Sequence, residues 1–227
     1  MAPTLPSLIL FARVPRQGRV KTRLAARLTE PGALRLYRAF LEDASRSYRS
    51  GGWSPVVAVE PDPDDPAIAE LFPLPWRRER QDEGDLGARL RFAFEQEFAR
   101  GAPAAIAVGS DHPALAPSLV ADALVRLAAG ESAAVIPAED GGYCAIGFSA
   151  RAPWAEAFRD VPWSTSNVLD TTRARLAGVG VTVCLLAGGY DVDLPEDVDR
   201  LRRDLAARNP ESPDFPRATS HALADLP

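Results

Sequence analysis

The chain has 227 residues, 46% of them hydrophobic and 25% charged, which is typical of a globular protein with one substantial core. A formal net charge of -5 argues against a general binding surface for nucleic acid or an anionic membrane, although a local basic pocket is compatible with it. The apolar run over residues 8–12 is too short for a membrane span or a signal peptide, and two cysteines are too few for a disulfide framework. We therefore expect a cytoplasmic protein with no nucleic-acid and no membrane partner.

The N-terminal segment predicts a buried strand over residues 7–14, a turn from Pro15 to Gly18, and a helical pattern that opens at Arg19. Free backbone N–H groups and the helix dipole meet at such a junction and favour a bound anion. The cations around it are Arg13, Arg16, Arg19, Lys21 and Arg23. A phosphate-bearing ligand is expected here, with a solvated basic helix start as the alternative. The sequence contains neither the Walker motif nor the dinucleotide-binding G-x-G-x-x-G.

Lys21 stands out because it is the single lysine among 26 basic residues. A lysine kept in a chain that otherwise uses arginine is expected where a compact ammonium is needed in place of a planar guanidinium. Survival by chance is the alternative.

The next segments predict an amphipathic helix over residues 31–48, a strand over 54–60, a short helix over 67–72 and an edge strand over 76–80. A polar loop over residues 81–90 then leads into a helix that runs through Phe98. Its glycines, Gly84 and Gly87, allow a ligand to approach the backbone closely. An ordinary strand-to-helix connection explains them equally well.

The apolar run over residues 104–109 predicts a buried central strand that stops at Ser110-Asp111. Ligands of α/β sheets bind outside the carboxyl ends of the strands, so Asp111 is placed like a ligand-binding residue. The alternative is that Asp111 only caps the following turn or helix.

Two polar loops follow a helix over residues 118–127 and a strand over 132–137. Asp140-Gly141-Gly142 is typical of a plain hairpin turn, or of a loop that presents backbone amides to a substrate oxyanion. Ser164, Thr165 and Ser166 precede a helix over residues 168–176, and one of them is expected to cap it while the others face an acceptor.

The C-terminal part predicts a strand over residues 179–186 and a last helix from Pro195, with Asp197 at its positive end. Asp191 and Asp193 share one face of an extended segment, where like charges repel unless a cation lies between them. We expect a domain over residues 1–208 and a Pro-rich tail over 209–227, read as an irregular strap or a mobile end. The alternation of strands and helices predicts an α/β fold with a mainly parallel sheet.

Six motifs, in this order, resemble one family: FARVPRQGRVKTRLA, LGARL, VGSDHPAL, DGGYCAIGF, PWSTSNVLDTT and DVDLPEDV. The chain resembles the DUF2064-type bacterial transferases over residues 8–205. These are relatives of nucleotide-diphospho-sugar transferases and include arsenosugar-biosynthesis glycosyltransferases. A more distant similarity is to the phospholactate, phosphoenolpyruvate and molybdenum-cofactor guanylyltransferases. The resemblance implies a single-domain GT-A or Rossmann-like αβα sandwich.

The resemblance also implies a nucleotide donor above the first strand and a divalent metal, Mg²⁺ or Mn²⁺, on Asp111. Further metal contacts are implied for Asp191 and Asp193. The usual D-x-D after the central strand is reduced here to Ser110-Asp111-His112, which keeps one of its two carboxylates. A contribution from Asp191 or Asp193 to metal binding therefore becomes necessary. The residues expected to bind the nucleotide and its phosphates are Arg13, Gly18, Lys21, Arg23 and Gly87.

The resulting hypothesis is a metal-dependent transferase with Lys21, Asp111 and Asp140 as catalytic residues, Asp140 being the candidate general base. The acceptor is expected beside Gly141, Gly142, Ser164, Thr165 and Ser166. We favour a glycosyltransferase that moves a sugar from a nucleotide-diphospho-sugar to a small-molecule acceptor. A nucleotidyltransferase that joins a nucleoside monophosphate to a phosphorylated acceptor and releases pyrophosphate is the alternative. A non-catalytic nucleotide-binding module is a second alternative.

Overall fold

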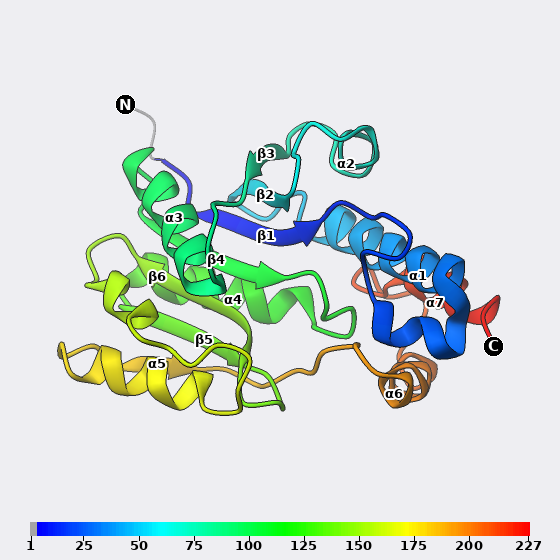
Figure 1. Cartoon of the computed structure of the whole chain (residues 1–227). Coiled ribbons are helices and arrows are strands. Elements are labelled where there is room, and N and C mark those ends of the chain that lie inside the picture. The colour runs from blue at the N-terminus through cyan, green and yellow to red at the C-terminus, as the bar shows by residue number, and fades with distance from the viewer. Residues whose placement is uncertain (1–3) are drawn as a thin grey trace.

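The computed structural model describes residues 4–227, which form a seven-stranded sheet between helices (Figure 1). The strands are β1 (Ser7–Arg13), β2 (Ser54–Glu60), β3 (Arg77–Arg80), β4 (Ala104–Gly109), β5 (Ala133–Pro137), β6 (Tyr143–Ser149) and β7 (Val183–Leu185). Their order is β3-β2-β1-β4-β6-β5-β7, and only the two pairings made by β6 are antiparallel. The predicted α/β class with a mainly parallel sheet is confirmed. Residues 1–3 of the predicted domain lie outside the described residues.

The helices cover both faces of the sheet. They are α1 (Ala25–Ser47), α2 (Pro66–Leu71), α3 (Leu86–Ala99), α4 (Pro117–Ala129), α5 (Val168–Ala177), α6 (Pro195–Ala206) and α7 (Arg217–Ala224), with short 3₁₀ helices η1 (Thr22–Leu24) and η2 (Trp154–Phe158). One core lies beneath α1, α4, α6 and α7, and a second lies beneath α3, α5 and η2. Within residues 4–227, each helix is too short or too polar to cross a bilayer.

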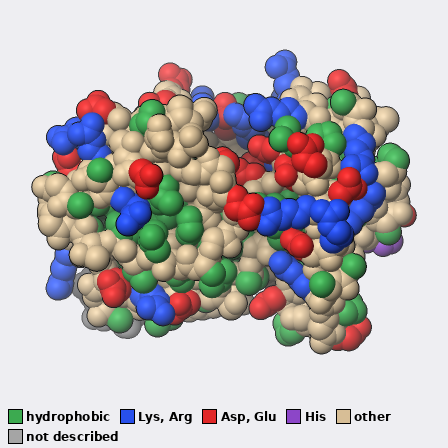
Figure 2. Space-filling model, turned by 90° about the horizontal axis from the view of Figure 1, so that it is seen from below, with side chains coloured by type: hydrophobic (Ala, Val, Ile, Leu, Met, Phe, Trp, Pro, Cys, Tyr) green, Lys and Arg blue, Asp and Glu red, His purple; other side chains and the backbone are tan. Residues whose placement is uncertain are grey.

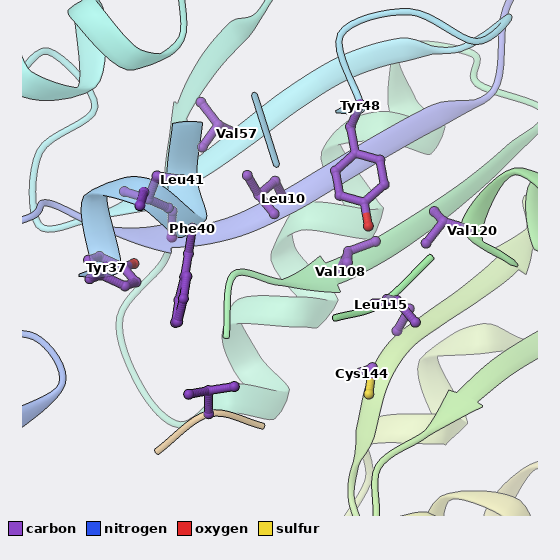
Figure 3. Close-up of a cluster of buried hydrophobic side chains, with 14 of the residues drawn as sticks. Leu10, Tyr37, Phe40, Leu41, Tyr48, Val57, Val108, Leu115, Val120 and Cys144 are labelled. Carbon is purple, nitrogen blue, oxygen red and sulfur yellow. The ribbon is translucent and has the colours of Figure 1, made fainter. Parts of the chain in front are cut away.

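Strand β1 contributes side chains to both cores, because successive side chains of a strand point to opposite faces of the sheet. Leu8 and Leu10 pack in the α1 core, while Ile9 packs in the α3 core. Figure 3 shows Leu10 and its neighbours on the adjacent strands close to Phe40 of α1. The apolar face of the amphipathic helix predicted over residues 31–48 is the part of α1 that fills this core. The sheet is therefore fixed from both sides, and its carboxyl edge is a rigid platform.

The C-terminal tail differs from the prediction of an irregular strap or mobile end. Residues 217–224 form α7, which packs on α1. Asp43 of α1 accepts hydrogen bonds from the backbone amides of Ala218 and Thr219, at 3.1 and 2.7 Å. The carboxylate that satisfies the start of α7 thus comes from a distant segment, which a local pattern in the tail does not reveal.

Three further boundaries differ from the predictions. The helical pattern expected from Arg19 begins only at Thr22, because Lys21 has a left-handed backbone (φ 47°). The last strand covers Val183–Leu185 and not residues 179–186. The 3₁₀ helix η2 was not predicted; Trp154 and Phe158 in it pack against Phe94 of α3.

Candidate active site

A cleft of about 660 Å³ opens beyond the carboxyl ends of β1, β2 and β4. This is the edge at which open α/β sheets bind ligands. The end of β1 and the segment after it form one wall, residues 138–143 and 163–168 form the facing wall, and the start of α3 and the segment before α6 lie at its sides. Seen from below, Lys and Arg side chains gather beside Asp and Glu side chains in the half of the molecule that holds α1 and α6 (Figure 2).

Lys21 joins the two carboxylates at the centre of the cleft. Its Nζ lies 2.6 Å from Asp111 Oδ1 and 2.7 Å from Asp193 Oδ1. The Lys21 side chain is only 4% exposed, whereas those of Asp111 and Asp193 are 44% and 43% exposed. Burial alone lowers the pKa of the Lys21 ammonium, but the two carboxylates outweigh it and the net shift is upward. Lys21 is therefore a permanent cation inside the cleft.

The local fold forces Lys21 into this position. Its neighbours Val20 and Leu24 are buried in the α1 core, and the amide of Leu24 donates to the Lys21 carbonyl at 3.0 Å. A left-handed backbone costs a non-glycine residue about 1–2 kcal/mol. The ammonium also lies 5.7 Å from the centre of the Phe40 ring. Strain of this kind is common at functional sites, because the surrounding contacts hold the residue in place.

A strap between β7 and α6 brings Asp191 and Asp193 to the cleft. The amide of Val192, which is fully buried, donates to the Asp111 carbonyl at 3.0 Å. Asp197 accepts from the Asp193 amide at 3.0 Å and from the Leu194 amide at 2.7 Å. Asp197 thus serves the start of α6, as predicted.

Asp191 faces a buried histidine and not Lys21. His112 Nδ1 lies 2.7 Å from Asp191 Oδ1 and 3.3 Å from the Tyr190 carbonyl oxygen. Burial alone lowers the pKa of His112, but Asp191 and Cys144 raise it to about 10. Burial raises the pKa of Asp191, and His112 reverses that shift, so the net change is downward. The pair is charged and holds the strap against the end of β4.

A second polar network lines the cleft near the ends of β2 and β3. Arg89 of α3 donates to Glu60 at 2.6 Å, and Arg13 lies 3.5 Å from the same carboxylate oxygen. Gln81 donates to the carbonyls of Ala12 and Ala58, at 3.0 and 2.9 Å, and so ties β1 to β2. Sequence reasoning missed Glu60 and Gln81. The strand-end rule that singled out Asp111 identifies both, because Glu60 is the last residue of β2 and Gln81 follows β3 directly.

The facing wall begins with the Asp140 turn. Asp140 Oδ1 accepts from the Gly142 amide at 2.9 Å, and the Gly141 amide donates to the Ala138 carbonyl at 3.2 Å. Both amides are therefore hydrogen-bonded within the turn. Of the two alternatives, the structure shows the plain hairpin turn. Gly141 has φ 89°, and a Cβ there would lie 2.1 Å from the Ser166 carbonyl oxygen. The glycine lets residues 161–168 approach the turn.

The helix cap expected from Ser164, Thr165 or Ser166 is wrong. Helix α5 begins after Asn167 without a side-chain cap. Thr165 instead donates to the Pro162 carbonyl at 2.7 Å and accepts from the Asn167 amide at 3.3 Å. The first turn of α5 uses a tertiary partner, because the Leu169 amide donates to the Gly141 carbonyl at 2.9 Å.

Most of the predicted site residues line the cleft. These are Arg13, Lys21, Arg23, Asp111, Asp140, Gly142, Ser164, Thr165, Asp191 and Asp193. Four others do not: Gly18, Gly87, Gly141 and Ser166. A Cβ on Gly87 would lie 2.7 Å from the Trp163 ring, so this glycine makes room for an aromatic side chain. Trp163 and Tyr143 line the cleft and were missed, because an aromatic residue in a sequence is more often part of the core than of a site.

The carboxylates of the cleft fit a metal ion that is held jointly with substrate phosphates better than one held by protein ligands alone. Within residues 4–227, no group of three or more His, Cys, Asp or Glu side chains is arranged to hold a metal. Asp111 and Asp193 each engage Lys21 through Oδ1, and both are open to the cleft. Mg²⁺ is commonly held by one or two carboxylates together with substrate phosphates. These two side chains fit that arrangement, and metal binding by Asp111, Asp191 and Asp193 stays a prediction.

Comparison with known proteins gives three similarities. The family described as uncharacterized proteins conserved in bacteria (DUF2064) matches residues 44–165. A phosphoenolpyruvate guanylyltransferase from Rubrobacter xylanophilus is 32% identical over 182 residues, 80% of this chain and 86% of that protein. The crystal structure of a proposed nucleotide-diphospho-sugar transferase from Desulfovibrio desulfuricans G20 superposes with a TM-score of 0.87 at 27% identity, covering 97% of each chain.

A more distant structure shares the fold alone. The 4-diphosphocytidyl-2C-methyl-D-erythritol synthase from Anaerococcus prevotii has a TM-score of 0.60 at 11% identity, over 90% of this chain and 97% of that one. The predicted GT-A or Rossmann-like αβα sandwich is confirmed by these neighbours.

Proposed function

We propose that this chain moves a sugar from a nucleotide-diphospho-sugar to a small-molecule acceptor, with Mg²⁺ or Mn²⁺ as cofactor. The chain belongs to the DUF2064 family and is a transferase, which is the premise of the proposal. The observation that carries the proposal is the ion triad of Lys21, Asp111 and Asp193 in a cleft with several arginines on the same wall. Positive groups and metal-binding carboxylates side by side suit a diphosphate that must be both held and released.

The donor diphosphate is assigned to the wall after β1. Arg13, Arg19 and Arg23 line the cleft there, next to Lys21. Arg13 is 64% exposed and only loosely paired with Glu60, so its guanidinium is available to a ligand. Arginine binds phosphate oxygens through two parallel N–H groups, which also fixes the orientation of the donor.

The reaction forms a bond between an acceptor oxygen and the sugar carbon, breaks the bond from that carbon to the phosphate oxygen, and releases a nucleoside diphosphate. Lys21 neutralises part of the negative charge that grows on the leaving group, a contribution of several kcal/mol in a partly dry site. A cation on Asp111 and Asp193, with Asp191 as a predicted further contact, would supply more positive charge at the same oxygens. Asp140 takes the proton of the acceptor hydroxyl, since its second carboxylate oxygen is free of the Gly142 amide.

Nucleotidyl transfer is the second candidate, and the 32% identity to a phosphoenolpyruvate guanylyltransferase favours it. In that reaction an acceptor phosphate attacks the α-phosphorus of a nucleoside triphosphate and pyrophosphate leaves. The same cationic wall would then hold the triphosphate.

A thermal-shift screen tests the proposal. UDP-glucose, GDP-mannose, GTP, CTP, UTP and ATP are each added with and without Mg²⁺ or Mn²⁺, because binding to the native state raises Tm by mass action. We expect a metal-dependent rise with a nucleotide sugar, lost in Asp111→Asn with little change in the Tm of the free protein. Asp122→Asn, in a surface pair with Arg126 on α4, is the control and keeps the rise. A rise confined to one triphosphate would replace the proposal with the second candidate.

A further inference from the structure

The two walls of the cleft differ in charge. Every Lys or Arg that lines it within residues 4–227 comes from the end of β1, from the segment after β1 or from α3: Arg13, Arg19, Lys21, Arg23 and Arg89. The facing wall, residues 138–143 and 163–168, contributes no cation to the lining and one carboxylate, Asp140. On the face seen in Figure 2, hydrophobic side chains come together in the half of the molecule that holds α5. The cleft is therefore cationic on one side and neutral to acidic on the other.

Two aromatic rings form the neutral wall. Tyr143 and Trp163 meet edge to face, with ring centres 6.4 Å apart and an interplanar angle of 89°. The Tyr143 hydroxyl is buried away from the cleft, and burial raises the pKa of this phenol, so it stays uncharged. Trp163 lies against Gly87 at the start of α3, where a side chain would collide with the indole. The indole is thus supported by Gly87, a residue that does not itself line the cleft.

We infer that this aromatic wall binds an uncharged acceptor that carries hydroxyl groups and an apolar face, such as a glycoside, with its ring against Trp163 and a hydroxyl on Asp140. The inference rests on the proposed function and narrows its acceptor. Sugar rings pack their C–H faces on aromatic side chains, while a carboxylate accepts hydrogen bonds from hydroxyl groups.

A phosphorylated acid fits this wall poorly. The amides of Gly141 and Gly142 are already hydrogen-bonded, so they are not free to bind a phosphate. The Asp140 carboxylate repels an anion, and a buried anion without a partner is costly. Arg89, on the helix that touches Trp163, is already paired with Glu60 at 2.6 Å, and the other lining cations lie on the wall assigned to the donor diphosphate.

The fluorescence of Trp163 can report the binding of a ligand at the aromatic wall. The indole N–H groups of Trp53 and Trp76 are hydrogen-bonded in the core, to the carbonyls of Tyr48 and Ser45 at 2.9 and 3.2 Å. Trp154 packs on Phe94 and Phe98 and does not line the cleft. The fluorescence difference between the wild-type protein and Trp163→Phe therefore isolates the tryptophan of the cleft.

The test titrates the full chain with neutral and anionic probes and follows this difference signal. The neutral probes are methyl α-D-glucopyranoside, methyl α-D-mannopyranoside and methyl β-D-ribofuranoside, and the anionic ones are phosphoenolpyruvate and 3-phosphoglycerate. We expect saturable quenching by at least one glycoside, none by the two acids, and at least fivefold weaker glycoside binding in Gly87→Ala, in which the indole is displaced but kept. Trp154→Phe is the matched control and keeps the wild-type affinity. Quenching by the acids with silent glycosides would overturn the inference.

The products of turnover separate this inference from the proposed function. Pyrophosphate released with a neutral acceptor would refute sugar transfer and leave the acceptor assignment standing. Nucleoside diphosphate released only with a phosphorylated acid would refute the acceptor assignment and leave sugar transfer standing.

Discussion

At the scale of single residues, Lys21 organises the cleft. Its ammonium is nearly inaccessible and touches two carboxylates from segments about 80 residues apart in the sequence, Asp111 and Asp193. Two like charges that share a small site repel each other unless a cation separates them. Lys21 is this cation in the free protein, and the expectation of a compact ammonium at this position is consistent with the little room around it.

Replacing Lys21 tests this role. Lys21→Met should lower kcat by about 10²–10³-fold, the usual cost of losing a group that stabilises transition-state charge. Lys21→Arg should restore little, because a planar guanidinium does not fit a side-chain site that is 4% exposed. Steady-state kinetics measure both, with Arg91→Met in an exposed pair on α3 as the control. Wild-type kcat in Lys21→Met would contradict the assignment.

His112 has a structural role at the same scale. Removing it leaves the Asp191 carboxylate without its partner and frees the strap that carries Asp193. His112→Ala should lower the free energy of unfolding by about 2 kcal/mol, since Asp191 is only partly buried and regains some hydration. Urea denaturation gives the value. The double variant with Asp191→Asn should lose less than the sum of the single variants; strict additivity would show that the two side chains are not coupled.

Among the predicted site residues, the charged ones line the cleft more often than the glycines do. The sequence placed Asp111 in the cleft because it follows the central strand, and Asp193 because it alternates with Asp191 in an extended segment. Gly87 and Gly141 were predicted to face ligands, but they accommodate Trp163 and the Ser166 carbonyl. A glycine that admits a ligand and a glycine that admits a neighbouring segment look the same in one sequence, because both positions require only the absence of a side chain.

At the scale of elements, the strands at the centre of the sheet could be predicted closely where they are continuous apolar runs. The strand predicted over residues 54–60 is β2, and that over 104–109 is β4. Helix α7 could not be predicted, because its first amides are bound by Asp43, about 175 residues away in the chain. The start of α5 likewise depends on the Gly141 carbonyl and not on its own hydroxyl residues.

The dependence of α7 on Asp43 gives a prediction. Asp43→Ala removes the acceptor for two amides, one of which, that of Thr219, is fully buried, and frees Arg46 from its pair. The loss should be about 2 kcal/mol, from the missing helix cap and the unsatisfied amide. Hydrogen exchange at residues 217–224 should accelerate by about 30-fold, while turnover stays unchanged because α7 lies outside the cleft.

Asp225→Asn is the control for this variant. It removes the exposed ion pair between Arg35 and Asp225 at the other end of α7. Exposed pairs contribute at most about 1 kcal/mol, so exchange should change little. Equal acceleration in both variants would contradict a specific role for Asp43.

At the scale of the whole molecule, the sheet order explains why distant residues meet. Strands β1 and β4 are neighbours, so Lys21 and Asp111 emerge side by side, and the strap after β7 crosses back over the same edge. A protein with a net charge of -5 thereby gathers five cations in the lining of a single cleft. Overall charge alone predicts no such site, because the fold decides which charges gather.

The identity of the phosphorus-containing product tests the central claim most directly. The protein is incubated with Mg²⁺, a nucleotide sugar that raises its Tm and a neutral glycoside, and in parallel with GTP and phosphoenolpyruvate. Phosphorus NMR then separates nucleoside diphosphate from pyrophosphate. We predict nucleoside diphosphate in the first reaction, with none in Asp111→Asn, and no pyrophosphate in the second. Pyrophosphate formed from GTP and phosphoenolpyruvate, with an inert nucleotide sugar, would contradict sugar transfer.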